Sequence, residues 1–580
     1  MSADRFFLYV LSGIRAAFGI TRIAVLCGLL VGLSVPGSTD DLTKARDGRD
    51  LEGQLRELLR NRIEAAGTPT KLTVSGRNLY SSVALPLFYQ RRSYLPAWIN
   101  GSGISRGAGE LLSALRGADA EGLRSSDYHL TKIGRMLERL GESPSDITRA
   151  GRRELVDLEL LLTDAFLLYG SHLVAGRVNP ETIDPEWFAN RRDVDMAEAL
   201  EEAVSNNTIP ETLENLRPSQ SGYARLREAL RSYRDIASKG GWPGVPVGPK
   251  MQKGDSGDRV ALLRERLEVT GDLRDGKTDD PQGFDQNLDE AVRRFQRRHG
   301  LDVDGIVGPA TLSALNVSAD ERIDRIQINM ERWRWLPQDL GPRYLIVNIA
   351  NFELDIVEGE KEVMTMRAIV GRDYRRTPVF SSKMTYLVLS PYWHVPPTLA
   401  VQDILPQVRK DIGYLTQKGI KVFQGWGADT REIDPNTVDW STVTGKNFNY
   451  RFRQDPGPVN ALGHVKFMLP NKFDVYLHDT TSRELFEKTA RAFSSGCIRI
   501  EKPIELAEYV LRGDPKWNRE AILTAIDRGI EQTIQLPEPI PVHLLYWTAW
   551  VDAAGTIQFR EDIYGRDRPL AEALVEKPPV

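Results

Sequence analysis

The chain is poor in cysteine and histidine. Its 580 residues include only two cysteines and seven histidines. Cys27 lies in an apolar N-terminal segment, so the remainder of the chain holds one thiol, Cys497, and no intrachain disulfide there can consume it. The histidines are scattered, and His464 and His478 are the closest pair. Because zinc sites usually need clustered ligands, this pattern argues against a metal centre. No phosphate-cradling glycine loop is present either, and we expect no cofactor.

An excess of positive charge is also missing. The net charge is −4, and no basic stripe with interleaved aromatic residues occurs, which argues against nucleic-acid binding. The 41% hydrophobic and 27% charged residues are ordinary for a globular protein. At 65.2 kDa the chain is too long for a single core, so we expect several domains.

The N-terminus differs from the rest of the chain. Arg5, Arg15 and Arg22 precede the apolar run Ile23–Val35, and small residues follow. This order predicts an export signal over residues 1–38, either cleaved or kept as an anchor in the inner membrane. Leu26 stands before Cys27 where a lipid-attachment site usually has a small residue. We therefore expect a periplasmic protein.

Residues 45–240 are predicted to be mostly helical. Apolar residues recur at helical spacing in 51–60, and 154–168 is a strongly apolar helix. No catalytic constellation occurs there. The isolated His129 and His172 are interpreted as hydrogen-bonded structural residues, and the region as a scaffold.

A Gly/Pro-rich linker at 240–249 precedes a compact unit, residues 250–318. The spacing predicts three helices, with Gly300 ending the second and Pro309 in the first turn of the third. The stretch RRFQRRHGLDVDGIVGPATL is specific, and residues Gly257 to Asn316 closely resemble the peptidoglycan-binding domain of wall enzymes. The alternative is a helical spacer.

The period becomes strand-like after about residue 340 and predicts a β-rich sandwich or barrel-like domain over 340–535, followed by a C-terminal extension at 536–580. Between Leu389 and Val465 we expect few strands and a helix around 404–410. Trp393, Trp426 and Trp440 make a disordered linker improbable there, so residues 391–463 are interpreted as an inserted lid.

Cys497 and His478 are the candidate nucleophile and base. His478 ends a predicted strand at 475–477, and Cys497 follows Ser494, Ser495 and Gly496. A thiol needs a base or a dipole to become reactive at neutral pH. Gly496 permits a tight turn that aims the N–H groups of Gly496 and Cys497 at an oxyanion. His394 and His464 are competing bases, and a buried structural cysteine is the alternative for Cys497.

Residues 342–515 resemble the catalytic domain of L,D-transpeptidases of the large periplasmic subfamily. The resemblance is carried by YLHDT at 476–480, SSGCIR at 494–499, RTPVFSS at 376–382 and RQDPGP at 453–458. Many members have a histidine where this chain has Ser495. The implied fold is a multidomain α+β chain: a β-rich catalytic domain with an inserted lid, a three-helix peptidoglycan-binding module and a mostly helical scaffold.

The resemblance implies that Cys497 attacks a tetrapeptide stem of peptidoglycan, releases D-alanine and passes the acyl group from a thioester to an amine on a second stem, giving a 3→3 cross-link. His478 would serve as general base and acid, and carbapenem-type inhibitors would acylate Cys497. Three alternatives stay open: a cysteine peptidase with water as acceptor, a zinc wall hydrolase and an inert wall-binding scaffold.

Three further residues besides Ser495 are candidate substrate contacts. Arg499 has two readings: it binds a substrate carboxylate, or it ties down the cysteine loop. Tyr476 and Trp393 either line the donor cleft or pack in the core.

Overall fold

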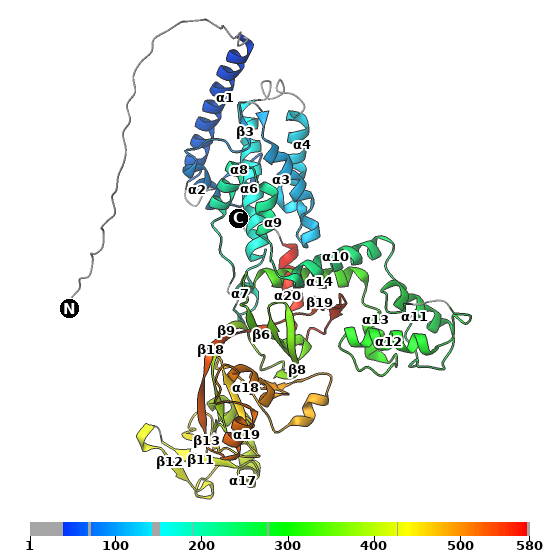
Figure 1. The fold of residues 1–580 in the computed structure, drawn as a ribbon, viewed down its shortest axis with the longest axis vertical. Coiled ribbons are helices and arrows are strands. Elements are labelled where there is room, and N and C mark those ends of the chain that lie inside the picture. Colours follow the sequence, from blue (N-terminus) through cyan, green and yellow to red (C-terminus); the bar gives the residue numbers. More distant parts are fainter. Residues whose placement is uncertain are drawn as a thin grey trace, which may run out of the picture.

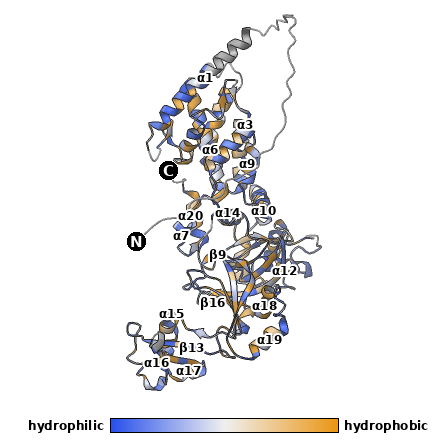
Figure 2. Ribbon diagram, turned by 60° about the vertical axis from the view of Figure 1, so that its left-hand side comes forward, coloured by the Kyte–Doolittle hydropathy of each residue, from blue (hydrophilic) through white to orange (hydrophobic). Residues whose placement is uncertain are grey.

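The computed structural model describes residues 39–67, 71–101, 103–141, 151–188, 191–274, 278–425 and 427–576. The predicted export signal, with Cys27, and the lid residue Trp426 lie outside these ranges. In Figure 1 the N-terminal helices group at one end of the molecule, the inserted segment lies at the other end, and the three-helix module projects to one side. Apolar residues run through both the helical part and the sheet (Figure 2). The predicted multidomain fold class is confirmed.

The scaffold is helical, as predicted. Its centre is α6, whose side chains are buried over nearly the whole length by the surrounding helices. This helix is long and apolar enough to span a membrane, since its most apolar 18-residue stretch has a mean hydropathy of 1.3. However, 89% of that stretch is buried within the protein. The scaffold elements are α1 (Thr39–Glu64), β1 (Thr73–Val74), β2 (Arg77–Asn78), α2 (Ala84–Arg91), β3 (Ile99–Asn100), β4 (Gly103–Ile104), α3 (Arg106–Arg116), α4 (Leu130–Leu140), α6 (Arg152–Ala175), α7 (Pro180–Ile183), β5 (Trp187–Phe188), α8 (Met196–Asn206), α9 (Ile209–Asn215) and α10 (Ser221–Ser238).

Both scaffold histidines have structural partners. His129 Nε2 lies 2.8 Å from Asp164 Oδ2, and His172 Nδ1 lies 2.9 Å from the Tyr128 hydroxyl. All of these groups are buried. The interpretation of both histidines as hydrogen-bonded structural residues is confirmed.

The three-helix module consists of α11 (Asp258–Val269), α12 (Gln286–Arg298) and α13 (Pro309–Leu315). The Asp285 carboxylate caps α12 by accepting from the Leu288 N–H at 2.8 Å, and Gly300 takes the left-handed conformation just beyond the helix, with φ +65°. Pro309 stands in the first turn of α13. Helix α14 (Ala319–Arg334) then packs on α10 and leads into the sheet.

The C-terminal part is built on a mixed sheet with the strand order β14-β15-β17-β8-β7-β6-β18-β9-β5. Because β14 also pairs with β9, the path closes on itself, which agrees with a barrel-like arrangement. The apolar face of the strands packs against α18 and α19. The elements are β6 (Arg343–Asn348), β7 (Glu353–Glu358), β8 (Lys361–Gly371), β9 (Val379–Leu389), β14 (Val465–Met468), β15 (Leu477–His478), β16 (Ala492–Ser494), β17 (Ile498–Ile500), α18 (Pro503–Leu511), α19 (Arg519–Asp527) and β18 (Gln532–Leu545).

The inserted segment forms its own small sheet, so the expectation of few strands was wrong. Strands β10 (Trp393–His394), β13 (Tyr450–Gln454), β11 (Ile420–Gln424) and β12 (Arg431–Ile433) lie in that order and are antiparallel. Helices α15 (Pro397–Leu399), α16 (Leu405–Lys410) and α17 (Gly413–Gln417) cover it, and α16 confirms the predicted helix. These strands are only two to five residues long, which is too short for a periodic pattern to stand out.

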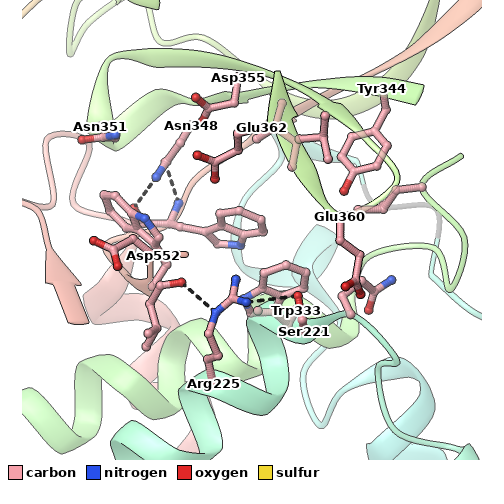
Figure 3. Close-up of a pocket in the computed structure, with 18 of the residues that line it drawn as sticks. Ser221, Arg225, Trp333, Tyr344, Asn348, Asn351, Asp355, Glu360, Glu362 and Asp552 are labelled. Atoms are coloured by element: carbon pink, nitrogen blue, oxygen red, sulfur yellow. Dashed lines mark hydrogen bonds between the residues drawn. The ribbon is translucent and has the colours of Figure 1, made fainter. Parts of the chain in front are cut away.

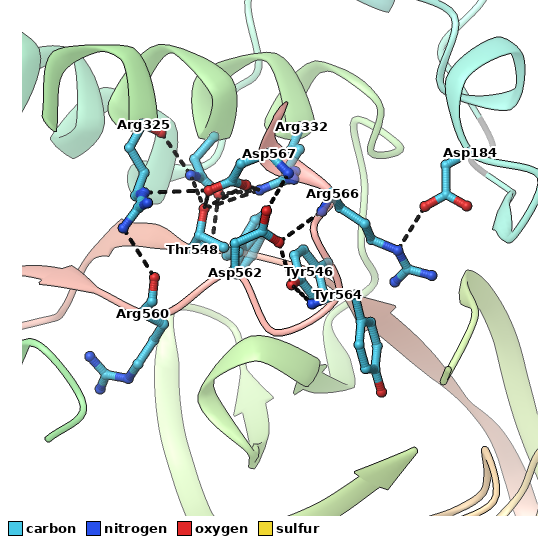
Figure 4. Close-up of polar contacts among 12 residues, drawn as sticks. Asp184, Arg325, Arg332, Tyr546, Thr548, Arg560, Asp562, Tyr564, Arg566 and Asp567 are labelled. Atoms are coloured by element: carbon cyan, nitrogen blue, oxygen red, sulfur yellow. Dashed lines mark hydrogen bonds and ion pairs between the residues drawn. The ribbon is translucent and has the colours of Figure 1, made fainter. Parts of the chain in front are cut away.

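The residues after 535 form part of the sheet rather than a separate extension. Strand β18 runs across the predicted start of the C-terminal extension and pairs with both β6 and β9. Beyond it lie β19 (Ala549–Val551), β20 (Ile557–Phe559) and α20 (Asp567–Val575). In Figure 4 this C-terminal stretch joins the scaffold to the sheet: Arg566 pairs with Asp184 at 2.7 Å, and Asp567 pairs with Arg332 of α14 at 2.7 Å.

Candidate active site

Adjacent parallel strands bring His478 and Cys497 to one face of the sheet. In the β15–β17 pair Leu477 is the partner of Ile498, and His478 is the partner of Arg499. The Ile498 N–H also donates to the Tyr476 carbonyl at 3.1 Å, which places Cys497 beside Tyr476. Since side chains alternate along a strand, Tyr476, His478, Cys497 and Arg499 all leave the face opposite the apolar core.

His478 is held in the tautomer that a general base needs. Its side chain is buried, and Nδ1 lies 2.5 Å from the Asp479 carbonyl oxygen. A carbonyl can only accept, so Nδ1 carries the proton and Nε2 keeps a free lone pair. Burial, reinforced by the positive charge of Arg499, lowers the pKa of His478 to about 3. The imidazole is therefore neutral at neutral pH.

Asp479, whose carbonyl holds His478, is itself held in place by its carboxylate. Its carboxylate accepts from the His464 N–H at 2.9 Å and pairs with Arg483 at 3.1 Å. Gly463 has φ +60°, and a Cβ there would meet the Asp479 carboxylate at 2.3 Å. The competing bases differ from His478, because the side chains of His464 and His394 are exposed and neither stands on the strand next to Cys497.

Cys497 is a free, half-buried thiol, and its Sγ lies 3.8 Å from the Asp474 carbonyl oxygen. Burial raises the pKa of the Cys497 thiol, while hydrogen bonding from Tyr476 and the charges of Lys466 and Arg499 act in the opposite direction. Cys497 and His478 thus rest as a neutral thiol and a neutral imidazole. For the Cys497 sulfur to act as a nucleophile, the thiol proton has to be transferred as the sulfur attacks.

Lys466 is a member of this group that the sequence pattern did not single out. It is the register partner of His478 across β14 and β15, and its ammonium lies 3.9 Å from the centre of the Tyr476 ring. The Tyr476 and His478 rings are 5.6 Å apart. Lys466 stands between the buried Val465 and Phe467, so its side chain leaves the face opposite the apolar core.

Arg499 points into the same region without a partner. Among the described residues no hydrogen bond or ion pair reaches its guanidinium, and Nε is buried. Burial lowers the pKa of Arg499. Of its two predicted roles, the tie to the cysteine loop therefore receives no support from a contact in the described residues.

The loop before Cys497 turns at Gly496, with φ +113°, a conformation that favours glycine. The Gly496 carbonyl accepts from Thr377 Oγ1 at 2.9 Å, and its N–H donates to Ser494 Oγ at 3.2 Å. The expectation that the Gly496 N–H is free for an oxyanion is therefore not met in this structure. Ser494 Oγ donates in turn to the Cys497 carbonyl.

Thr377 is itself held by the C-terminal stretch. The Thr377 N–H donates to the Tyr564 hydroxyl at 3.2 Å, and that hydroxyl donates to the Gly371 carbonyl at 2.6 Å. Tyr564 is buried beside Tyr546 in the network of Figure 4. No local sequence signal connects Tyr564 with Cys497, because the contact depends on the path of the chain after β18.

The inserted segment reaches the cysteine loop through Arg375. Its guanidinium donates to the exposed Ser495 hydroxyl at 3.1 Å and forms a forked ion pair with Asp403, with one arm at 2.7 Å. Gln402 accepts a further bond at 2.9 Å. Trp393 lies elsewhere in the insertion, half-buried against the apolar cluster of that segment.

No group of three His, Cys, Asp or Glu side chains that could hold a metal ion occurs within the described ranges.

A free thiol and a neutral imidazole thus lie on one face of a mixed sheet. Three family descriptions match the chain: "Scaffold domain" over residues 83–230, "Putative peptidoglycan binding domain" over 256–315 and "L,D-transpeptidase catalytic domain" over 342–517. The chain thus carries an L,D-transpeptidase catalytic domain together with a scaffold domain and a peptidoglycan-binding domain, as the resemblance implied.

Two relatives with different names match parts of the chain. A Haemophilus influenzae protein named "Putative L,D-transpeptidase" is 35% identical over 246 residues, which is 42% of this chain and 48% of that protein. The chain therefore spans about half the length of this relative. The Mycobacterium tuberculosis protein "N-acetylmuramoyl-L-alanine amidase CwlM" is 42% identical over 80 residues, which is 12% of this chain and 20% of that protein.

Solved structures give only a weak likeness. The L,D-transpeptidase of Stackebrandtia nassauensis is 14% identical, covers 52% of this chain and 96% of its own and has a TM-score of 0.20. For the L,D-transpeptidase of Xylanimonas cellulosilytica the identity is 15%, the coverage 52% and 98%, and the TM-score 0.15. Values this low carry no argument about the present chain.

Proposed function

We propose that the protein is an envelope enzyme that forms 3→3 cross-links between peptidoglycan stems through a thioester on Cys497. The observation that carries the proposal is the pairing of β15 with β17, which puts the Cys497 thiol and the unprotonated Nε2 of His478 on one face. The domain assignment and the peptidoglycan-binding domain support peptidoglycan as donor and acceptor and a location in the cell envelope.

In the acylation step, the Cys497 sulfur attacks the carbonyl before the terminal D-alanine of a tetrapeptide stem while its proton passes to His478 Nε2. The C–N bond then breaks, His478 returns the proton to the leaving amine, and D-alanine departs. The acyl group remains as a thioester.

In the transfer step, an amine of a second stem attacks the thioester carbonyl and gives its proton to His478. The C–S bond breaks, a C–N bond has formed, and the sulfur regains its proton. Lys466 stabilises negative charge that develops on sulfur, and the unpaired guanidinium of Arg499 binds a carboxylate of the stem.

The Gly496 N–H reaches the oxyanion only if it leaves Ser494 Oγ. The Cys497 N–H is the other candidate donor of the loop. We assign the turn at Gly496 to positioning the nucleophile, together with Thr377.

Residues 391–463 act as a lid in this proposal. The Arg375 contacts with Asp403 and Gln402 join the inserted segment to Ser495, which precedes the nucleophile by two residues. A cover at this point excludes water and favours an amine acceptor.

Product analysis tests the function. Purified protein is incubated with a defined tetrapeptide, with and without an amine acceptor, and the products are separated by mass. We expect release of D-alanine and a cross-linked dimer that the Cys497→Ala variant does not make. Hydrolysed tripeptide alone would instead make the protein a carboxypeptidase, and activity retained in Cys497→Ala would overturn the role of the thiol.

A further inference from the structure

A groove lies away from Cys497, between the scaffold and the sheet. It has a volume of about 520 Å³ and is bordered by the start of α10, the end of α14, strands β6 to β8 and the β19–β20 hairpin. In Figure 3 the carboxylates of Asp355 and Glu362 lie on the strand side, and Arg225, Ser221 and Trp333 lie on the helical side. No step of the proposed reaction uses this groove.

One side of the groove is acidic. Asp355 is the partner of Thr365, and Val357 is the partner of Glu362, so the two carboxylates leave the same face of the β7–β8 pair. Glu353 stands two residues before Asp355 on that face, and Glu360 lies in the adjoining turn. Within the described ranges no ion pair connects any of these carboxylates to a cation; Asp355 accepts only from the Thr365 hydroxyl, at 2.7 Å.

The two arginines of the groove are occupied elsewhere. Arg225 donates to the Val551 carbonyl at 3.2 Å and to Ser221 Oγ. Arg560 donates through Nε to Asn351 Oδ1 at 2.6 Å and through Nη1 to the Arg298 carbonyl at 3.0 Å. The charges of Arg560 and Arg491 offset part of the charge of Glu353, whereas no cation pairs with Asp355 or Glu362 within the described ranges. Burial, followed by repulsion from Glu353 and Glu362, raises the pKa of Asp355 to about 7.

The other side of the groove is aromatic and includes an unsatisfied donor. Trp333 is 94% buried, since its relative exposure is 6%, and its indole N–H has no hydrogen-bond partner in the described residues. It stacks on Trp547 with ring centres 4.4 Å apart, and Trp550 completes the wall. A buried donor without a partner costs free energy unless a ligand supplies an acceptor.

The groove also adjoins the three-helix module. Arg560, which lines it, contacts the Arg298 carbonyl at the end of α12. A ligand in the groove is thus next to the part of the chain that holds peptidoglycan in the proposed function.

We propose that this groove is a second peptide site, which binds the free ammonium group of a wall stem peptide without reacting with it. The inference rests on the proposed function for the identity of the ligand. The ammonium lies among Asp355, Glu353 and Glu362, the methylene chain packs on the tryptophans, and a peptide carbonyl accepts from Trp333. A second stem held here tethers the enzyme to the wall while Cys497 acts on another.

Binding is measured by calorimetry on the full chain carrying Cys497→Ala, so that no reaction occurs. The probes are the tetrapeptide L-Ala-γ-D-Glu-meso-diaminopimelyl-D-Ala and the same peptide acetylated on its side-chain amine. The groove variant adds Asp355→Asn and Glu362→Gln, which preserve size and hydrogen bonding. The matched control adds Asp527→Asn and Glu520→Gln, two exposed acids of α19.

We expect the groove variant to weaken binding of the free-amine peptide at least tenfold, acetylation to do the same, and the control to leave the affinity unchanged. Equal affinity of groove variant and control would overturn the proposal, as would absence of binding by the parent protein at millimolar peptide. Thermal unfolding shows whether the groove variant is folded; if it is not, the separate Asp355→Asn and Glu362→Gln variants decide the question. Failure of the proposed function shows up elsewhere, as a missing thioester in the protein that retains Cys497.

Discussion

His478 and Arg499 are register partners across the parallel strands β15 and β17, and the charge of Arg499 helps to lower the pKa of His478. The guanidinium helps to keep the imidazole unprotonated, while its own side chain finds no partner among the described residues. In the proposed function, Arg499 thus keeps the base neutral and offers a carboxylate-binding group on the same face as the nucleophile. This pairing leads to the first prediction.

Replacing Arg499 with glutamine should raise KM for the tetrapeptide donor by about tenfold or more, because a charged hydrogen-bond donor to the substrate is lost. Steady-state release of D-alanine measures the change. Arg519→Gln, an exposed arginine on α19, is the control and should behave as the parent protein. An unchanged KM in Arg499→Gln would return Arg499 to a purely structural role.

The thiol should show no plateau of reactivity near pH 7. Because burial raises the pKa of Cys497 and His478 stays neutral, no thiolate–imidazolium pair forms at rest. Alkylation of Cys497 by iodoacetamide should therefore rise about tenfold per pH unit from 7 to 9, following the thiolate fraction. A rate that is already maximal at pH 7 would show a preformed ion pair and contradict the neutral resting state.

Stability should fall on acidification, and His172 should account for part of the fall. Burial lowers the pKa of His172 to about 3, whereas an unfolded histidine titrates near 6.5. Between these values the unfolded chain binds a proton that the native chain does not, so stability is lost as pH falls below 6.5. At pH 5 the loss is about 2 kcal/mol for this group.

Urea unfolding at pH 7.5 and pH 5 tests this linkage. The His172→Asn variant keeps a polar group near the Tyr128 hydroxyl but cannot titrate. It will be less stable at pH 7.5, yet its further loss on moving to pH 5 should be smaller than that of the parent protein. If both proteins lost the same free energy of unfolding between pH 7.5 and pH 5, His172 would not contribute to the pH dependence.

Breaking the Arg375 contact should open the lid. In Arg375→Ala the fork to Asp403 and the bond to Ser495 disappear together, so water gains access to the thioester. We expect a larger hydrolysed fraction relative to cross-linked product, and Arg519→Ala, which breaks an exposed pair with Glu505, serves as control. A ratio of transfer to hydrolysis that does not move, with the domain folded, would leave the inserted segment without a gating role.

Much of the fold could be predicted from the sequence because the signals are local. The apolar helix α6, the capped helix α12 and the strands β6 to β8, which alternate or run apolar, can each be recognised within a short stretch of sequence. The sheet of the insertion was missed because its longest strands, β11 and β13, are only five residues each.

The sequence predicted those residues of the candidate site that belong to a short motif. Cys497 and His478 stand in short, specific sequence patterns. Lys466 and Tyr564 reach the site only through strand register and the path of the C-terminal stretch, which no local pattern encodes. The engagement of the Gly496 N–H by Ser494 Oγ was likewise invisible, because it depends on a rotamer rather than on residue type.

Intact-mass measurement of the acyl-enzyme tests the central claim most directly. The protein is mixed with a tetrapeptide donor, quenched in acid within seconds and weighed, and the modified residue is located by fragmentation. The account predicts one adduct, equal in mass to the donor without its terminal D-alanine, on Cys497 and absent from Cys497→Ala. A protein that releases D-alanine with no covalent species at Cys497 would contradict the account.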